Sequence, residues 1–171
     1  MIVIGVDPGI GCTGYGIIEA PSKIVAFGTI RPPARAELAT KLLHVSEKLQ
    51  RLLGEHRPDH CVVENIFHAV NAKSALVLGH VRGAILLTAL KNGCTVYEYT
   101  ALQIKKAVTG YGHAEKEQVR AMVRILLNLP NAPLAIDSSD ALAAAICHAQ
   151  THLTRERMAD MIGSSRTGKQ R

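Results

Sequence analysis

The sequence predicts an α/β fold in which helices flank one five-stranded mixed sheet. Three β-patterned segments come first, at residues 2–6, 13–19 and 23–30, and a short turn joins the last two as a hairpin. Two further strands, at residues 60–63 and 94–99, each follow a long helical pattern. Hairpin strands are antiparallel and strand–helix–strand units are parallel, so the sheet is expected to combine both kinds of pairing.

The helices are predicted from apolar residues that recur at spacings of three and four. Thr100 is expected to cap one of them, and Asn92-Gly93 to end another. The helical patterns cover residues 36–56, 74–90 and 101–108, a segment around 119–127, and a last helix from about Asp137 to about His152.

Length and charge indicate one folded domain with a basic end. The chain has 171 residues, 47% of them apolar and 20% charged, with a net charge of +6. We expect a domain over residues 1–153 and a basic, flexible tail over residues 154–171, because residues 155–171 hold five basic and two acidic residues. A basic surface favours a polyanionic partner such as nucleic acid, although a basic tail is also typical of a solvated chain end.

The cysteines and the apolar segments indicate a cytoplasmic protein. The four cysteines are widely spaced and form no C-x-x-C pair, so we expect reduced thiols that serve as small packing residues. The apolar start at residues 1–6 stops at Asp7, which is too short for a signal peptide. No other segment is expected to be long and apolar enough to cross a membrane.

Four carboxylates form the most informative pattern in the sequence. Asp7 and Glu64 each end an apolar strand, and Asp137 and Asp140 share one face of the last helix because they are three residues apart. Taken singly, Asp137 is typical of a helix cap, Asp7 of a turn and Glu64 of the start of a loop. Together they favour a site at the ends of central strands, which is where open α/β sheets bind ligands.

The chemistry of this acidic set indicates divalent metal ions. Clustered carboxylates raise one another's pKa, and bound cations remove that cost. Hard oxygen ligands suit Mg²⁺ or Mn²⁺. Two such ions about 4 Å apart activate a water molecule and stabilise the leaving oxygen in phosphodiester cleavage.

Four sequence blocks resemble the RuvC-type Holliday junction resolvases. They occur in the order found in that family and cover roughly residues 1–150: Ile4-Gly5-Val6-Asp7-Pro8-Gly9 with Thr13-Gly14-Tyr15-Gly16; Val63-Glu64-Asn65-Ile66-Phe67 with Asn71-Ala72-Lys73-Ser74-Ala75-Leu76; Gln103-Ile104-Lys105 with Gly110-Tyr111-Gly112-His113-Ala114-Glu115-Lys116; and Asp137-Ser138-Ser139-Asp140-Ala141-Leu142-Ala143. The resemblance implies an RNase H-like fold with helices around the mixed sheet.

The resemblance also implies an activity and a set of site residues. The family cuts four-way DNA junctions with two symmetric metal-dependent nicks in homologous recombination and DNA repair, leaving 5′-phosphate and 3′-hydroxyl ends. By matching position, the metal ligands are Asp7, Glu64, Asp137 and Asp140; some relatives have a histidine in place of Asp137. Lys105 and Lys116 match basic positions near the scissile phosphate and complete the catalytic set.

Further implied contacts are with DNA and with other proteins. The predicted DNA-binding residues are Phe67, Lys73, Lys105 and Lys116, with Phe67 stacking on opened bases or else covering the end of the sheet. The resemblance implies a homodimer, and the apolar helix at residues 74–90, with Gly79 and Gly83, suits a symmetric interface. It also implies partners from the branch-migration complex and no membrane partner.

Several alternatives stay open at the level of sequence. The chain could be a junction-binding module without catalysis, a related resolvase-like protein of ribosomal RNA processing, or a sugar-kinase or actin-type ATPase, for which it is short. Residues 9–14 fit G-x-G-x-x-G, but a strand follows where a dinucleotide site needs a helix. His148 and His152 lack the glutamate of a zinc protease, so we predict surface histidines. His68 and His113 flank the matching blocks without a predicted role.

Overall fold

The computed structural model describes residues 1–65, 71–129 and 133–167. One sheet has the strand order β3-β2-β1-β4-β5, with antiparallel pairing among the first three strands and parallel pairing of β4 with β1 and β5. This confirms the predicted mixed sheet. The strands are β1 (Ile2–Asp7), β2 (Thr13–Glu19), β3 (Lys23–Ile30), β4 (His60–Asn65) and β5 (Thr95–Thr100).

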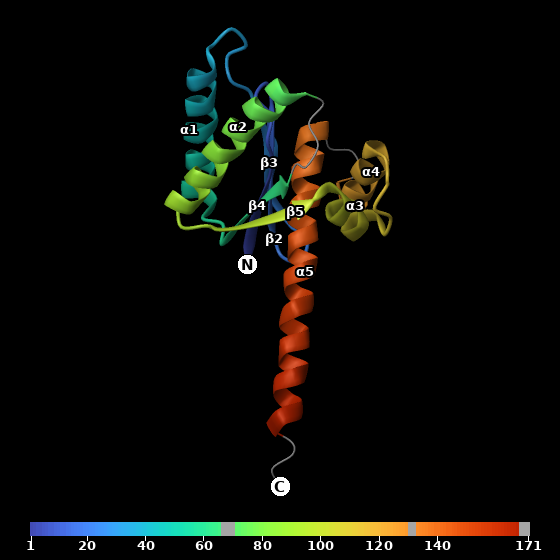
Figure 1. The fold of residues 1–171 in the computed structure, drawn as a ribbon. Helices are drawn as coiled ribbons and strands as arrows, with labels where there is room; N and C mark the ends of the chain where they lie inside the picture. The colour runs from blue at the N-terminus through green and yellow to red at the C-terminus, as the bar shows by residue number, and fades with distance from the viewer. Residues whose placement is uncertain (66–70, 130–132, 168–171) are drawn as a thin grey trace.

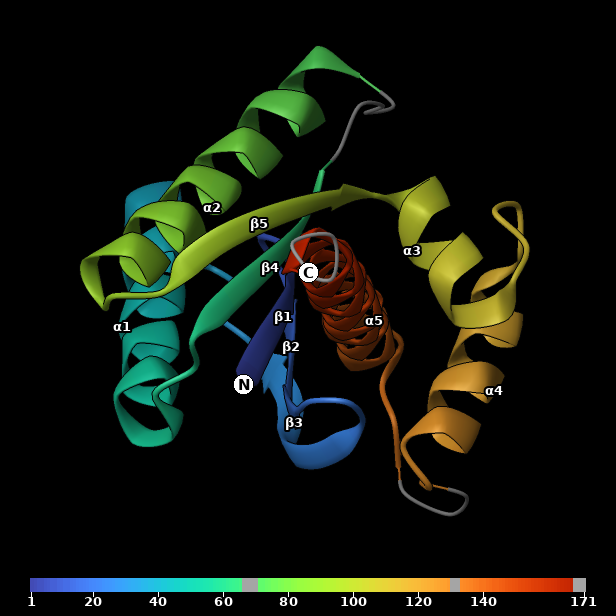
Figure 2. The ribbon, with the colours of Figure 1, turned by 90° about the horizontal axis from the view of Figure 1, so that it is seen from below.

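Helices cover both faces of the sheet. Figure 1 and Figure 2 show α1 and α2 on one side and α3, α4 and α5 on the other. Neighbouring residues of one strand therefore enter two different cores: Val3 packs toward α5, and Ile4 packs toward α1 and α2. This two-sided burial explains why the middle positions of the central strands β1 and β4 are continuously apolar or glycine. The helices are α1 (Leu38–His56), α2 (Ala72–Lys91), α3 (Ala101–Thr109), α4 (Lys116–Leu126) and α5 (Ile136–Thr167).

The last helix is longer than the sequence predicted. We expected it to end near His152, but α5 continues to Thr167 and projects beyond the sheet (Figure 1). Strong helix formers such as Arg155 and Glu156 carry it past that point, and His152 and Glu156 form an i,i+4 ion pair at 3.3 Å. The division into a domain of residues 1–153 and a basic tail of residues 154–171 stays a prediction.

Helix α2 also departs from an expectation. It is long and apolar enough, by length and composition, to cross a membrane, whereas we expected no such segment. One side of α2 belongs to the core, where Val81 and Ile85 are buried and Thr88 bonds to Ser46 of α1 at 2.7 Å. Core burial therefore accounts for part of its apolar character.

The four cysteines are free, as predicted, and Cys61, Cys94 and Cys147 are buried. Burial is the first cause that raises the pKa of each of these thiols. They are therefore inert packing residues.

Candidate active site

Three carboxylates from separate elements converge in one cleft of about 350 Å³. Asp7 ends β1 and Glu64 lies near the end of β4. The parallel register pairs Val6 with Val63, so the acidic residues that follow them are neighbours at the carboxyl ends of two adjacent strands. Asp140, in the first turns of α5, lines the same cleft. We call this space the acidic cleft.

A row of glycines lets α5 carry its carboxylates to the sheet. A Cβ atom on Gly5 would lie 1.9 Å from the carbonyl oxygen of Ala141, and one on Gly14 would lie 2.0 Å from that of Asp137. No side chain fits at these distances, so the helix backbone rests directly on β1 and β2. Ser138 fixes the start of the helix by donating a hydrogen bond of 2.8 Å to the carbonyl oxygen of Gly28.

Two lysines complete the acidic cleft. Lys105 of α3 and Lys116 of α4 both line it, and the Nζ atom of Lys116 lies 3.0 Å from Oδ2 of Asp140. This hydrogen bond is the main reason why the pKa of Lys116 is raised. The Lys116 side chain remains largely exposed, so its ammonium group can reach a bound anion at the mouth of the cleft.

The carboxylates of the cleft destabilise one another's charge. Burial, followed by the charges of Asp140, Glu64 and Asp137, raises the pKa of Asp7 to about 7, while Lys116 acts in the opposite direction. Burial and then Asp140 raise the pKa of Glu64. Near neutral pH, and without a bound cation, a substantial share of Asp7 therefore keeps its proton.

Asp137 lies one turn before Asp140 and takes a different direction. It is not among the residues that line the cleft. Burial, followed by the neighbouring Asp137 carboxylate, raises the pKa of the Cys12 thiol to about 11. The charge of Asp137 nevertheless acts on Asp7, so the fourth predicted ligand lies at the rim of the acidic set.

The donor set fits a hard divalent cation. Carboxylate oxygens dominate the polar lining, and neither histidine nor cysteine is among the lining residues of the described chain. Mg²⁺ and Mn²⁺ prefer such oxygens, and a cation would relieve the repulsion that raises the pKa of Asp7. The residues that could hold it are Asp7, Glu64 and Asp140, with Asp137 one helical turn away.

Comparison with known proteins places the chain in a family. The family model described as crossover junction endodeoxyribonuclease RuvC matches residues 3–148. A protein of that description from Bordetella avium is 45% identical over 174 residues, covering 100% of this chain and 96% of the relative. One from Ruminiclostridium cellulolyticum is 41% identical, covering 97% and 99%. The chain belongs to the RuvC family.

Solved structures agree with the RuvC assignment. The structure of Thermus thermophilus RuvC in complex with a Holliday junction substrate superposes with a TM-score of 0.81 and 33% identity, covering 87% of this chain and 93% of that one. The yeast mitochondrial Holliday junction resolvase has a TM-score of 0.58 at 14% identity, covering 91% and 81%, and shares the fold. The predicted fold class and RuvC resemblance are therefore confirmed.

The remaining predicted residues either lie away from the acidic cleft or fall outside the described part of the chain. Lys73 is exposed at the start of α2 and lines a neighbouring hollow with Ile10 rather than the acidic cleft. Phe67 and His68 lie outside the described residues. His113 packs edge-on against Tyr111 and is not among the residues that line the cleft in the described chain.

Arg82 of α2 is a positioning residue that sequence reasoning missed. Its guanidinium donates hydrogen bonds to the backbone carbonyl of Glu64 and to the carboxylate of Glu98 on β5. It thereby fixes the end of β4, where the Glu64 side chain enters the cleft. Its signal in the sequence was that a charged residue interrupts the apolar helix predicted at residues 74–90, between Gly79 and Gly83.

The prediction of surface histidines was wrong for His148. This residue is 1% exposed, because α5 lies close against the sheet at that point, and His152 is only half-buried. Both pack against His60 of β4. These three residues are called the histidine group below.

Proposed function

We propose that this chain resolves four-way DNA junctions by hydrolysing one phosphodiester bond in each of two strands of like polarity. The observation that carries the proposal is the convergence of Asp7, Glu64 and Asp140 with two lysines in one cleft of a RuvC-family chain. A related protein, the RuvC of Thermus thermophilus, is described in complex with a Holliday junction substrate. Homologous recombination and DNA repair are the processes in which such junctions arise.

The carboxylates would hold divalent metal ions, Mg²⁺ or Mn²⁺, two for each cleft. Such ions supply Lewis acidity toward a phosphate and make water a stronger nucleophile at neutral pH. Asp7 would contribute as a carboxylate, because cation binding favours the ionised form over the protonated form that burial favours. Asp137 would act from the rim of the cleft.

The lysines would act on the DNA backbone. Lys116 can exchange its contact with Asp140 for a phosphate oxygen, since both are anionic oxygens. Lys105 lines the same cleft from α3 and would stabilise the charge that develops on the phosphate. Attack in line with the 3′-oxygen leaves a 5′-phosphate and a 3′-hydroxyl, so a ligase is expected to seal the nicks. Lys73 and Phe67 are proposed to contact the junction outside the cleft.

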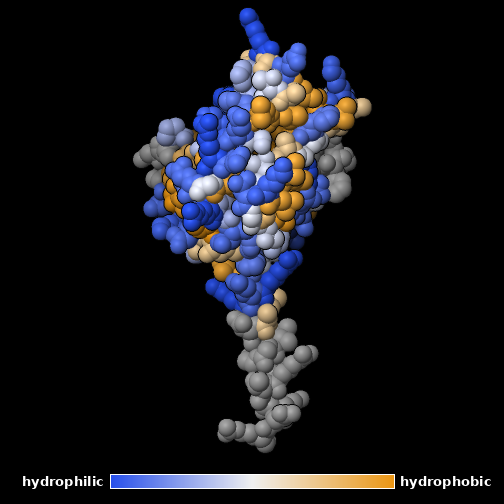
Figure 3. Space-filling view, turned by 90° about the vertical axis from the view of Figure 1, so that its left-hand side faces the viewer, coloured by the Kyte–Doolittle hydropathy of each residue, from blue (hydrophilic) through white to orange (hydrophobic). Residues whose placement is uncertain are grey.

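A homodimer would match the two-fold symmetry of the junction. Helix α2 offers a surface for it: Leu76, Leu87 and Leu90 are exposed, and a Cβ atom on Gly79 or Gly83 would meet nothing within 4 Å. Apolar patches interrupt the charged surface on the side formed by α1 and α2 (Figure 3). The glycines leave room for the backbone of a second copy to approach closely.

The dimer proposal is tested with Gly83→Glu. A buried charge at a symmetric interface is expected to shift the chain to a monomer in size-exclusion chromatography with light scattering. Gly54→Glu is the matched control, because Gly54 is also an exposed helical glycine with open space around it. If both variants form as much dimer as each other, α2 is not part of the dimer interface.

The proposed setting is the bacterial cytoplasm, where proteins of the branch-migration complex would act on the same junctions. A junction-binding module without catalysis and a resolvase-like protein of ribosomal RNA processing are the competing functions. The nicking experiment below separates them.

The central experiment compares a synthetic four-way junction with linear duplex, each with Mg²⁺ or with EDTA. Wild-type protein is expected to make paired symmetric nicks in the junction only, and only with metal. Asp7→Asn is expected to reduce the rate more than about 100-fold while junction binding persists. Glu47→Gln, which removes an exposed carboxylate from α1, is expected to cut normally.

Each other outcome rejects the proposal in a different way. Tight junction binding without nicks would identify a binding module. Cleavage of structured RNA in preference to the junction would favour the ribosomal function. Normal nicking by Asp7→Asn would remove the acidic cleft as the place of reaction.

A further inference from the structure

Three histidines gather at the end of the sheet opposite to the acidic cleft. His60 starts β4, and His148 and His152 lie on successive turns of α5. One ring nitrogen of each residue can be chosen so that all three atoms lie within 4.8 Å of one another. The closest pair is Nδ1 of His60 and Nε2 of His148, at 2.8 Å.

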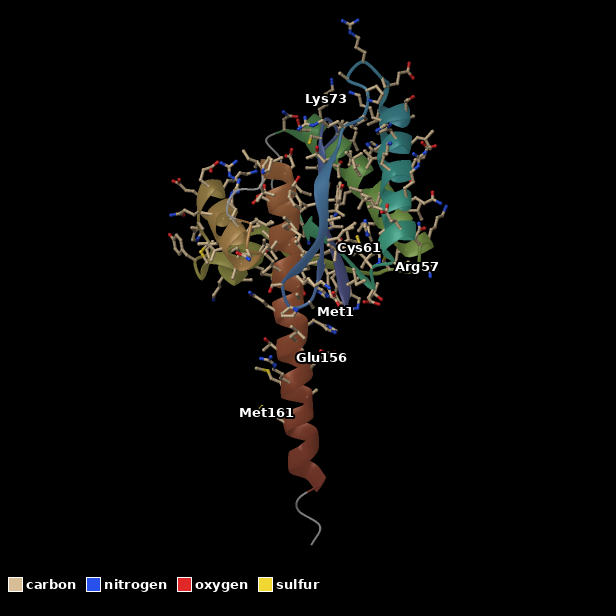
Figure 4. All side chains as sticks on the ribbon, turned by 180° about the vertical axis from the view of Figure 1, so that it is seen from behind. Met1, Arg57, Cys61, Lys73, Glu156 and Met161 are labelled. Atoms are coloured by element: carbon tan, nitrogen blue, oxygen red, sulfur yellow. The ribbon has the colours of Figure 1, made fainter. Side chains whose placement is uncertain are left out.

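The histidine group is separate from the acidic cleft. His60 lies four residues before Glu64 on an extended strand, which corresponds to about 13 Å. His148 lies eight residues after Asp140 on one helix, which corresponds to about 12 Å. In Figure 4, Cys61, which follows His60 on β4, and Glu156, which lies one turn after His152 on α5, are well below Lys73 at the start of α2.

A tyrosine orients the buried member of the group. The hydroxyl of Tyr99 lies 3.0 Å from Nδ1 of His148 and can accept the proton of that nitrogen in a hydrogen bond. In this tautomer the lone pair of Nε2 points toward His60. Ligand histidines in metal sites typically have their second nitrogen held in this way by a neighbouring oxygen.

A carboxylate stands beside the third histidine. Oε1 of Glu156 lies 3.3 Å from Nε2 of His152. Two ligand atoms of a tetrahedral zinc ion, each about 2.0–2.1 Å from the metal, lie about 3.3 Å apart. Glu156 lies beside His152 alone and is not part of the three-residue group, so a water molecule would complete the tetrahedral set; the 2.8 Å distance between His60 and His148 would open by about 0.5 Å to admit the ion.

We propose that the histidine group binds one borderline divalent metal ion, with Zn²⁺ as the preferred occupant, through His60, His148 and His152. Imidazole ligands favour Zn²⁺, whereas the carboxylates of the acidic cleft favour Mg²⁺ or Mn²⁺, so the two ends of the sheet select different ions. The proton on Nδ1 of His60 moves to Nε2 of the same ring when the metal takes its place, so no net proton is released.

The charge state of the histidines is suited to this role. Burial, followed by the neighbouring histidines, lowers the pKa of His148 to about 4, and burial lowers the pKa of His60. Neutral imidazole is the form that binds metal. The ion would cross-link α5 to β4 and so hold the helix that carries Asp137 and Asp140.

The test measures Zn²⁺ binding to the full chain, prepared without a histidine tag and stripped of metal. Isothermal titration is performed with Mg²⁺ in excess, so that the acidic cleft is occupied. Wild type is expected to bind one Zn²⁺ per chain. His152→Gln is expected to weaken binding more than about 100-fold, and Tyr99→Phe, which keeps the ring, about 10- to 100-fold.

Two matched variants are expected to bind like wild type. His56→Gln replaces a half-buried histidine outside the group, and Asp7→Asn alters the other end of the sheet. Zn²⁺ is also expected to raise the melting temperature of wild type and His56→Gln but not that of His152→Gln. Circular dichroism in EDTA verifies that each variant is folded.

Two results would overturn the proposal. One is equal Zn²⁺ affinity and stoichiometry in wild type and folded His152→Gln. The other is loss of Zn²⁺ binding in Asp7→Asn alone, which would assign the ion to the acidic cleft.

Discussion

The start and the middle of α5 gather ionisable groups that burial affects in opposite directions. At the acidic cleft, burial and like charges hold the pKa of Asp7 up at about 7. At the histidine group, burial and neighbouring rings hold the pKa of His148 down at about 4. In both places the buried group resists ionisation, but that resistance keeps a proton on the acid and removes one from the base.

This difference determines which ligand each end can accept. The carboxylates gain from a cation because it lowers the cost of their charge, and hard oxygen donors select Mg²⁺ or Mn²⁺. The lowered pKa values of His60 and His148 keep their lone pairs available, which suits Zn²⁺. One helix thus serves two kinds of chemistry because its neighbours differ at the two ends of the sheet.

The largest effect is expected from a substitution that prevents α5 from packing on the sheet, because this disturbs the acidic cleft and the histidine group together. Gly5→Val would place a Cβ atom 1.9 Å from the carbonyl oxygen of Ala141, a backbone atom that cannot move alone. We expect the free energy of unfolding, measured by chemical denaturation, to fall by more than about 4 kcal/mol. Junction nicking and Zn²⁺ binding should be lost together, because both ends depend on the same helix.

Gly11→Val is the control for this prediction, since a Cβ atom there meets nothing within 4 Å. Its stability is expected to change by less than about 0.5 kcal/mol. A Gly5→Val protein with wild-type stability would show that α5 does not depend on the close approach.

The acidic cleft was predictable from sequence because an acidic residue that ends an apolar run marks the end of a buried strand. Asp7 and Glu64 each interrupt an apolar run, and the parallel pairing of their strands follows from the intervening helix. The matching RuvC blocks then supplied Lys105 and Lys116. The structure adds that Asp137 is not among the residues that line the cleft and that its carboxylate also acts on the Cys12 thiol, a neighbour that helical spacing alone does not reveal.

The histidine group was not predictable by the same reasoning. His60 and His148 are 88 residues apart, and no short spacing links them. Their contact depends on how closely α5 lies against the sheet. The glycines of β1 and β2, rather than the histidines, permit that close approach. The length of α5 was underestimated for a related reason, since residues after His152 lack an apolar stripe and continue the helix by propensity and a local ion pair.

The smaller predicted effect is a pH dependence of opposite sign at the two ends, measured in EDTA. An unfolded aspartate loses its proton near pH 3.8, whereas Asp7 keeps its proton to about pH 7. The folded state binds more protons between these values, so the contribution of Asp7 to stability falls as pH rises. Between pH 4 and pH 7 the free energy of unfolding of Asp7→Asn should therefore rise by on the order of 3 kcal/mol relative to that of wild type. Any pH-independent effect of the substitution adds the same amount at every pH.

For His148 the sign is reversed. Its ordinary pKa is 6.5 and its folded pKa is about 4, so the unfolded state binds more protons in that window and wild-type stability is lost as pH falls through it. Relative to wild type, His148→Gln should therefore gain on the order of 3 kcal/mol as pH falls from 6.5 to 4. As pH changes, the denaturation midpoints of the two variants should diverge from that of wild type in opposite directions. The reason is that folding keeps a proton on Asp7 but excludes one from His148. Parallel curves would mean that neither end is as shielded from water as its burial indicates.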